Sequence, residues 1–354
     1  MQLGILGFPK VGKTTLFNLL TASEHETDKF AASRKTNLGV AEVPDRRLEQ
    51  LRDLFDPRRY TPASVTYVDI PGIKKGQSAE SLDLVKLREV DALLHVVRAF
   101  EDEEILHTEG EIDPQRDVES LDLELILADH ELVGRRLERL EQSKKRGLNP
   151  EETQEQKLLE DVVLAALENE TPLREVELEP EQEKRLRGFQ LLSAKPMLVL
   201  LNVDEARLSE GPSGALNLRA GVEMIAISAP IEAEVSQLDG NEQDEFLAEL
   251  GLDEPSVDRV IRASYELLGL ISFFTVGEDE VRAWTIRRGT VARAAAGAIH
   301  SDLERGFIRA EVVGWEDLLR LGSLAACRDQ GLLRLEGKVY VTRDGDIMHI
   351  RSGV

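Results

Sequence analysis

Short apolar runs alternate with amphipathic segments over the first hundred residues, which is the pattern of an α/β domain with a parallel sheet. These runs have the length and apolar character of strands, and they lie at 3–6, 38–43, 64–70 and 90–97. Leucine and phenylalanine at helical spacing predict a helix over 46–55. Two later runs, 196–201 and 224–227, predict the last strands of the same sheet.

Between these two groups of strands, apolar residues recur every three to four positions, as in amphipathic helices. Leu121, Leu125 and Leu132 lie on one helical face, and residues 158–167 repeat the pattern. The polar segment 144–150 (KKRGLNP) separates the two helices. We therefore expect an antiparallel helical hairpin inserted into the α/β domain, with its charged residues in solvent.

A third pattern begins near residue 269, where two apolar strands flank an acidic turn at 277–279. A helix over 291–304 and apolar segments ending at 337–341 and 346–350 complete a small α+β domain with its own core. This domain shows no catalytic constellation. The predicted domains are a nucleotide-binding domain (1–117 and 196–267), a helical hairpin (118–195) and a C-terminal domain (268–354).

The loop after the first strand carries the strongest chemical signal. Residues 7–14 (GFPKVGKT) fit G-x-x-x-x-G-K-[ST], the phosphate-binding P-loop, between a strand and a helix. Backbone N–H groups of such a loop surround phosphate oxygens, while the lysine reaches the β and γ phosphates and the hydroxyl binds Mg²⁺. The predicted phosphate contacts are Lys10, Val11, Gly12, Lys13, Thr14 and Thr15.

A second nucleotide signal follows the strand at 64–70. Asp69 at the strand end can hold a water molecule on Mg²⁺, and Gly72 lets a backbone N–H face the γ phosphate. The next residue is Ile73, whereas Ras-type GTPases have a glutamine there that orients the attacking water. An aliphatic side chain cannot orient water, so hydrolysis requires another group or is very slow.

Further hydroxyl and imidazole candidates lie in loops. Ser33 and Thr36 are candidates for completing the Mg²⁺ shell, although each is also an ordinary loop residue. His107 follows a strand at the edge where open α/β sheets bind ligands, and a histidine without a role is the alternative. His95, inside an apolar run, is predicted to be a core histidine with satisfied hydrogen bonds.

The base-recognition segment departs from that of GTPases, which use N-K-x-D. Asn202 is present, but Val203 replaces the lysine and Glu205 replaces the aspartate that binds guanine. These replacements weaken guanine preference. The backbone of Ser228 and Ala229, after the last strand, is placed to contact the base.

Charge limits the classes of partner. The net charge of −23 argues against electrostatic coating of nucleic acid and against sequence-specific DNA binding. The excess lies upstream of residue 269, because twelve acidic residues balance twelve basic ones beyond it. No apolar run reaches the length of a membrane span, and a single cysteine fits a reducing cytoplasm.

Taken together, these segments make the chain resemble the YchF-type, or Obg-like, ATPase family of P-loop proteins. The resemblance rests on motifs at 7–15, 43–48, 68–72, 88–102, 124–129, 191–196, 202–205 and 344–350. It implies a Ras-like G domain, an inserted coiled-coil hairpin and a C-terminal TGS domain of β-grasp type. It also implies Mg²⁺, a preference for ATP over GTP, and the large ribosomal subunit or the 70S ribosome as partner. In this family a loop histidine, here His107, has been regarded as the substitute for the catalytic glutamine.

Four departures from the family pattern fall near the phosphates. Lys10 stands where the family usually has asparagine, and Ser33 replaces a threonine. Ala32 occupies the position of a cysteine linked to redox control. The glycine-rich segment after Gly72 is shortened, so we expect it to move less.

The sequence thus predicts a slow, Mg²⁺-dependent ATPase whose nucleotide state controls docking to the ribosome. Lys13 and His107 are the predicted catalytic residues, and Thr14, Ser33 and Asp69 the predicted magnesium ligands. One alternative is a GTPase. Another is a nucleotide-sensing binding module without useful turnover.

Overall fold

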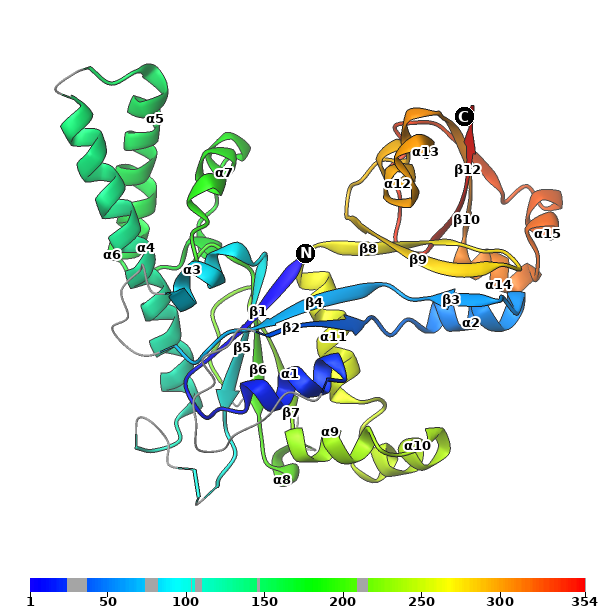
Figure 1. The fold of residues 1–354 in the computed structure, drawn as a ribbon, viewed down its shortest axis with the longest axis horizontal. Helices are drawn as coiled ribbons and strands as arrows, with labels where there is room; N and C mark the ends of the chain where they lie inside the picture. Colours follow the sequence, from blue (N-terminus) through cyan, green and yellow to red (C-terminus); the bar gives the residue numbers. More distant parts are fainter. Residues whose placement is uncertain are drawn as a thin grey trace. The chain divides into compact units, whose positions relative to one another are not determined.

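The computed structural model describes residues 1–23, 37–73, 82–102, 104–105, 110–144, 147–208 and 216–353 (Figure 1). The chain forms two compact units. Unit 1 contains residues 1–39 and 66–260, and unit 2 contains residues 40–65 and 261–354. This grouping differs from the predicted domains, because 40–65 belong with the C-terminal residues and the hairpin belongs with the nucleotide-binding residues. The finer three-domain division stays a prediction.

Unit 1 is built on a six-stranded sheet of the predicted α/β type, with strand order β2-β4-β1-β5-β6-β7. The strands are β1 (Gln2–Leu6), β2 (Asn37–Glu42), β4 (Ser64–Asp69), β5 (Ala92–Arg98), β6 (Met197–Asn202) and β7 (Glu223–Ile227). β1 is parallel to both β4 and β5, and β6 is parallel to both β5 and β7. The carboxyl ends of these five strands therefore meet at one edge, where open α/β sheets bind ligands. Both β2 and β4 cross the boundary between the two units.

The helices of unit 1 follow the strands in the order expected of such a sheet. They are α1 (Lys13–Thr21), α3 (Leu82–Glu89), α8 (Glu205–Leu208), α9 (Ala229–Val235) and α10 (Gly240–Glu249), and α11 (Ser256–Leu267) leads into unit 2. Every residue of β5 is buried, because a central parallel strand is covered on both faces. Its apolar run was therefore a reliable strand signal.

The predicted helical hairpin is present (Figure 1). Its first arm is α4 (Pro114–Lys144), which begins four residues before the predicted start. The second arm is continuous through α5 (Pro150–Leu158), the π-helical η1 (Leu159–Leu164) and α6 (Ala165–Glu168). Asn149 and Glu152 form a reciprocal capping box, and Pro150 occupies the first turn, so the local sequence sets where the second arm begins. Short helices η2 (Leu173–Glu175), α7 (Pro180–Leu186) and η3 (Arg187–Phe189) lead to β6.

Buried carboxylates join α4 to the rest of unit 1, a feature that the sequence analysis missed. Asp129 is fully buried and accepts hydrogen bonds from Arg88 (2.9 Å) and from the backbone N–H groups of Leu192 (2.9 Å) and Ser193 (2.7 Å). The Ser193 hydroxyl donates a fourth bond to it, at 2.8 Å. Arg88 lies at the end of α3, so this carboxylate connects three separate segments. Charges in the hairpin are thus not confined to its solvated faces.

Unit 2 contains a second six-stranded sheet, with strand order β11-β10-β12-β8-β9-β3. Its strands are β3 (Arg59–Thr61), β8 (Leu270–Thr275), β9 (Glu280–Arg287), β10 (Phe307–Gly314), β11 (Arg334–Glu336) and β12 (Asp346–Ser352). β8 and β9 form an antiparallel hairpin, β12 lies parallel to β8, and β10 is antiparallel to β12. With α12 (Ala292–Ile299) packed on the core of this sheet, the arrangement is the predicted β-grasp.

Residues 40–65 contribute two elements to unit 2. The helix predicted over 46–55 is α2 (Arg46–Phe55), and Leu48 and Leu51 on its inner face are fully buried. The sequence analysis missed β3, a strand of only three residues that pairs in parallel with β9, with Tyr60 opposite Val281. Such a short edge strand is fixed by its partner and not by its own composition.

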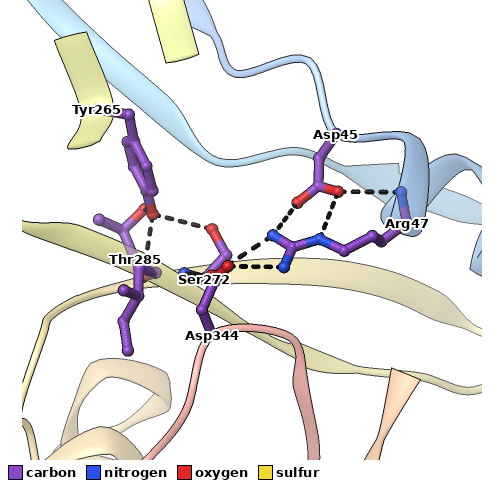
Figure 2. A network of polar contacts seen from close by, with 7 residues as sticks. Asp45, Arg47, Tyr265, Ser272, Thr285 and Asp344 are labelled. Carbon is purple, nitrogen blue, oxygen red and sulfur yellow. Dashed lines mark hydrogen bonds and ion pairs between the residues drawn. The ribbon is translucent and has the colours of Figure 1, made fainter. Parts of the chain in front are cut away.

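A polar network holds α2 within unit 2 (Figure 2). Asp45 caps the helix by accepting from the Arg47 N–H (3.0 Å), and it also pairs with the Arg47 guanidinium (2.8 Å). The same guanidinium pairs with Asp344 (2.7 Å), which accepts from the Ser272 N–H of β8 (2.9 Å). Tyr265 extends the network by hydrogen bonding to the Ser272 hydroxyl (2.9 Å). One arginine therefore connects α2 to the loop that precedes β12.

Two predictions for the C-terminal residues were wrong. The helix predicted over 291–304 is broken at His300, whose extended backbone ends α12 and whose Nδ1 accepts from the Asp302 N–H at the start of α13 (Ser301–Arg305). The apolar segment 337–341 is not a buried strand. Val339 and Val341 are exposed there, in the loop between β11 and β12. The remaining helices are α14 (Trp315–Leu321) and α15 (Leu324–Asp329).

Within the described residues, no helix combines the length and the apolar composition needed to cross a bilayer.

Replacement of Asp129 by alanine is expected to lower the free energy of unfolding by about 3–5 kcal/mol, because Arg88 would keep a buried charge without its partner. Urea denaturation measures this loss. The matched control on the same helix is Glu131→Ala, which removes a half-exposed ion pair with Arg135 and should cost no more than about 0.5 kcal/mol. Equal losses in the two variants would contradict this account of α4.

Candidate nucleotide-binding site

The loop between β1 and α1 has the backbone geometry of an anion-binding site. Gly12 begins α1 from a left-handed conformation, with φ of +95°. A Cβ atom on this glycine would lie 2.5 Å from the side-chain nitrogen of Asn202, so both the conformation and the space require glycine. Lys10, before it, also has positive φ and is exposed. The loop therefore turns sharply into the helix, whose first N–H groups are free to bind an anion.

Lys13 is a buried cation at the start of α1. Its side chain is 8% exposed, and its ammonium donates to the Phe8 carbonyl oxygen at 2.7 Å. Burial lowers the pKa of Lys13 to about 8, although the Asp69 carboxylate partly opposes this effect. A buried ammonium whose protonated form is destabilised by desolvation is stabilised by a bound anion. A phosphate group is an anion that would fit this position.

Thr14 and Asp69 are close together, as the sequence predicts for magnesium ligands. The Thr14 hydroxyl donates to the Asp69 carboxylate at 3.0 Å, and Asp69 is buried at the end of β4. Hydroxyl and carboxylate oxygens are the donors that Mg²⁺ prefers, so this pair fits the expected ion. Asp69 also lies close enough to Lys13 to influence its pKa.

The segment after β4 packs directly against the P-loop. A Cβ atom on Gly72 would lie 3.0 Å from the Pro9 nitrogen and 3.2 Å from the Lys13 ammonium, so only glycine fits without displacement. The next side chain, Ile73, is buried, and its N–H donates to the Gly7 carbonyl at 3.2 Å. An apolar side chain directed into the interior cannot position the attacking water.

Asn202 connects the P-loop to the segment after β7. Its side-chain amide donates to the Val11 carbonyl (3.2 Å), and its side-chain oxygen accepts from the Ala229 N–H (3.4 Å). Ser228 and Ala229 are both buried. The structure thus brings together the P-loop, the end of β6 and the segment after β7, all at the carboxyl edge of the sheet.

The two positions that differ from GTPases have different environments. Val203 is buried in an apolar cluster with Leu208 and Ile231, and its N–H donates to the Ile227 carbonyl (2.9 Å). Its side chain therefore belongs to the core. Glu205 begins α8 and is exposed. No lysine stem is available at position 203 to cover a base.

Arg98 is a structural residue of the site that the sequence analysis did not single out. It is buried at the end of β5 and donates to the carbonyl oxygens of Phe100 (3.1 Å) and Ile105 (2.9 Å). Its guanidinium also lies 4.6 Å from the Phe100 ring centroid. Arginine in an apolar strand was the available signal, since a buried guanidinium must find acceptors. Here it fixes the start of the loop after β5.

The remaining predicted site residues are accounted for as follows. Thr15 is exposed on α1, on the side away from the buried Leu16. Ser33, Thr36 and His107 lie outside the described residues. They stay predictions.

His95 differs from its prediction. It is buried in β5, but neither ring nitrogen has a hydrogen-bond partner among the described residues. Burial, with smaller effects from Arg174 and Lys13, lowers its pKa to about 3. The ring is therefore neutral at physiological pH, and it is not the satisfied core histidine that the sequence suggested.

Two family models match the amino-acid sequence. Residues 2–130 match a model described as "50S ribosome-binding GTPase". Residues 270–353 match YchF-GTPase_C, described as "Protein of unknown function (DUF933)".

Full-length relatives are also found. This chain is 44% identical to the Ribosome-binding ATPase YchF of Bacillus subtilis (strain 168) and 40% identical to that of Escherichia coli O157:H7, with 99% of each chain covered in both cases. Among solved structures, the Schizosaccharomyces pombe YchF GTPase aligns with a TM-score of 0.84 at 31% identity. That alignment covers 99% of this chain and 97% of the other.

The buried Lys13 predicts a pH-dependent affinity for nucleotide. Above the pKa of about 8, the protonated fraction of Lys13 falls about tenfold per pH unit, and the affinity for phosphate should fall with it. Calorimetric titration of a non-hydrolysable ATP analogue with Mg²⁺, between pH 7.5 and 9.5, measures this dependence. Lys13→Met should bind weakly with no such dependence, whereas Lys10→Met, which removes the exposed lysine of the same loop, should retain it. A flat profile for the unaltered protein would refute the assignment.

Proposed function

Because this chain belongs to the YchF family, we propose that it binds ATP with Mg²⁺, hydrolyses it slowly and uses its nucleotide state to control association with the ribosome. The observation that carries this proposal is the convergence of Lys13, Thr14 and Asp69 beside a glycine-bounded loop. The curated relatives are named ribosome-binding ATPases, which supports the ribosome as partner. The proposed partner is the large ribosomal subunit or the 70S ribosome, and the proposed location of this association is the cytoplasm.

The phosphates are bound by Lys13 and the backbone N–H groups of 10–15. Lys13 neutralises charge on the β and γ phosphates, and its bond to Phe8 is exchanged for bonds to phosphate oxygens. Thr14 and Asp69, which are joined by a 3.0 Å hydrogen bond, would hold Mg²⁺ together with Ser33, Asp69 acting through water. When bound, the ion offsets the negative charge that develops on the phosphates during transfer.

Hydrolysis requires a group that orients water, and Ile73 cannot supply it. We assign this role to His107, in the loop that follows β5. The start of that loop is held by Arg98 through backbone carbonyls, so the loop leaves the sheet from a fixed position. If no group orients water, the protein is instead a nucleotide-sensing module with negligible turnover.

ATP is the proposed nucleotide. Val203 is committed to the core and cannot cover a base, and the longer carboxylate of Glu205 suits the guanine contacts poorly. GTP is the second candidate, since one matching family model and the S. pombe structure carry the name GTPase. The net charge of the chain gives no support for sequence-specific DNA as a partner.

Titration of nucleotide-free protein with non-hydrolysable ATP and GTP analogues, in the presence of Mg²⁺, tests the choice of base. ATP should bind at least about tenfold more tightly, a difference of about 1.4 kcal/mol. Glu205→Asp restores the shorter carboxylate and should narrow this ratio. Equal or tighter binding of the GTP analogue by the unaltered protein would favour the GTPase function over the ATPase function.

Replacement of His107 by alanine should reduce phosphate release about tenfold or more while leaving the affinity for ATP unchanged, because the imidazole acts on water and not on binding. The Lys13→Ala variant provides the background rate of phosphate release. His349→Ala, which removes an exposed histidine of unit 2, is the matched control and should hydrolyse ATP normally. Unchanged hydrolysis in His107→Ala would remove this residue from the mechanism. Turnover equal to the blank in the unaltered protein would favour the binding module.

A further inference from the structure

The net charge of the chain is unevenly divided between its two units. Unit 2 contains 18 acidic and 18 basic residues, so its net charge is zero, and unit 1 carries the whole excess of −23. A polyanion such as RNA is repelled by unit 1 at long range but not by unit 2. If part of this protein contacts RNA, its electrostatics favour unit 2.

Two loops of unit 2 lie side by side and concentrate basic residues. They are 287–293, which runs from the end of β9 to the first turn of α12, and 337–343, between β11 and β12; we call them the basic loop pair. Backbone hydrogen bonds join them, from the Ala292 N–H to the Tyr340 carbonyl (2.7 Å) and from the Thr342 N–H to the Thr290 carbonyl (3.0 Å). The two loops therefore form one surface, although 43 residues lie between them in the sequence.

This surface contains five basic residues and no acidic one. All five are exposed, and they are Arg287, Arg288, Arg293, Lys338 and Arg343. Arg288, Arg293 and Lys338 form no ion pair with any other described residue, whereas Arg343 interacts electrostatically with the Asp346 carboxylate. The Arg293 side chain donates to the Glu304 backbone carbonyl (3.3 Å), but this neutral acceptor does not compensate the charge of the guanidinium.

Most arginines elsewhere in unit 2 behave differently, although Arg46, Arg59 and Arg309 are also exposed and form no ion pair with a described residue. Nine arginines pair with carboxylates, namely Arg47, Arg52, Arg58, Arg282, Arg305, Arg320, Arg328, Arg334 and Arg351. Because unit 2 has zero net charge and most of its other arginines pair with carboxylates, the basic loop pair keeps an excess of positive charge. Unpaired arginines at a surface are available to bind phosphate.

The same surface exposes apolar side chains between the basic ones. Val339 is 84% exposed and Val341 is 51% exposed. The apolar composition of 337–341 is typical of a buried segment, but the structure turns these valines outward in the loop. A combination of exposed apolar and unpaired basic side chains is suited to a partner that presents phosphates together with flat apolar groups.

We infer that the basic loop pair is the surface of this protein that contacts RNA, through phosphate groups of ribosomal RNA. This inference rests on the proposed association with the ribosome, which is built largely of RNA. Because phosphate contacts carry little sequence information, the surface positions the protein and does not select a sequence.

The test is charge reversal of three residues, Arg288→Glu, Arg293→Glu and Lys338→Glu, in the full-length protein. Ribosome binding is measured by co-sedimentation with 70S ribosomes and with protein-free ribosomal RNA, at several salt concentrations and with an ATP analogue present. We expect the variant to bind ribosomes at least about tenfold more weakly. Its slope of log affinity against log salt should be shallower by roughly 2 to 3, which corresponds to three lost phosphate contacts.

The matched control is Arg305→Glu, Arg320→Glu and Arg328→Glu. These side chains are also exposed, but they are paired with carboxylates, and their reversal changes the net charge by the same amount. The control should bind within about twofold of the unaltered protein, and both variants should unfold at its temperature and bind the ATP analogue normally. Equal losses in the two variants, or no loss in the first, would overturn the inference. If the first variant lost ribosome binding but the unaltered protein did not bind protein-free RNA, the inference would be overturned, and the contact would be assigned to a ribosomal protein.

The proposed function fails in a different way. It fails if the unaltered protein does not bind ribosomes in any nucleotide state, whereas the inference fails if binding is normal and does not involve the basic loop pair.

Discussion

A lysine ammonium buried at the foot of a glycine-bounded loop is the constraint around which unit 1 is arranged. The ammonium is stable there only with acceptors nearby, and the loop offers it one carbonyl and the field of Asp69. Gly12 lies in this loop, and Gly72 and Asn202 lie against it. The ends of β4 and β6 are therefore fixed by their contacts with the loop. A bound phosphate would complete the charges of this site, which is why the geometry supports nucleotide binding.

Local signals in the sequence were sufficient for much of the fold. The P-loop, α2, the strand ends at Asp69 and Asn202, and the break of the hairpin at 144–150 each depend on neighbouring residues, and the structure has them where they were predicted. The chemical roles of the site residues stay predictions, since Ser33 and His107 lie outside the described residues.

What could not be predicted depends on partners far away in the chain. β3 is a strand only because β9 offers it an edge, and Asp129 is buried only because Arg88 and the turn at 192–193 satisfy it. The exposed valines at 339 and 341 have the same origin, because the loop pairs with 290–292 and not with a sheet. Apolar composition alone cannot distinguish these cases.

The position of residues 40–65 changes what counts as a separable piece of this protein. The chain leaves the nucleotide-binding sheet along β2, builds α2 and β3 into the β-grasp unit, and returns along β4. A fragment that ends at residue 267 would retain α2 but lose what covers Leu48 and Leu51, and Arg47 would lose Asp344. A fragment that begins at 268 would lack its edge strand. Neither half is a natural module, so gene fusions and truncations at that point would create two incomplete proteins.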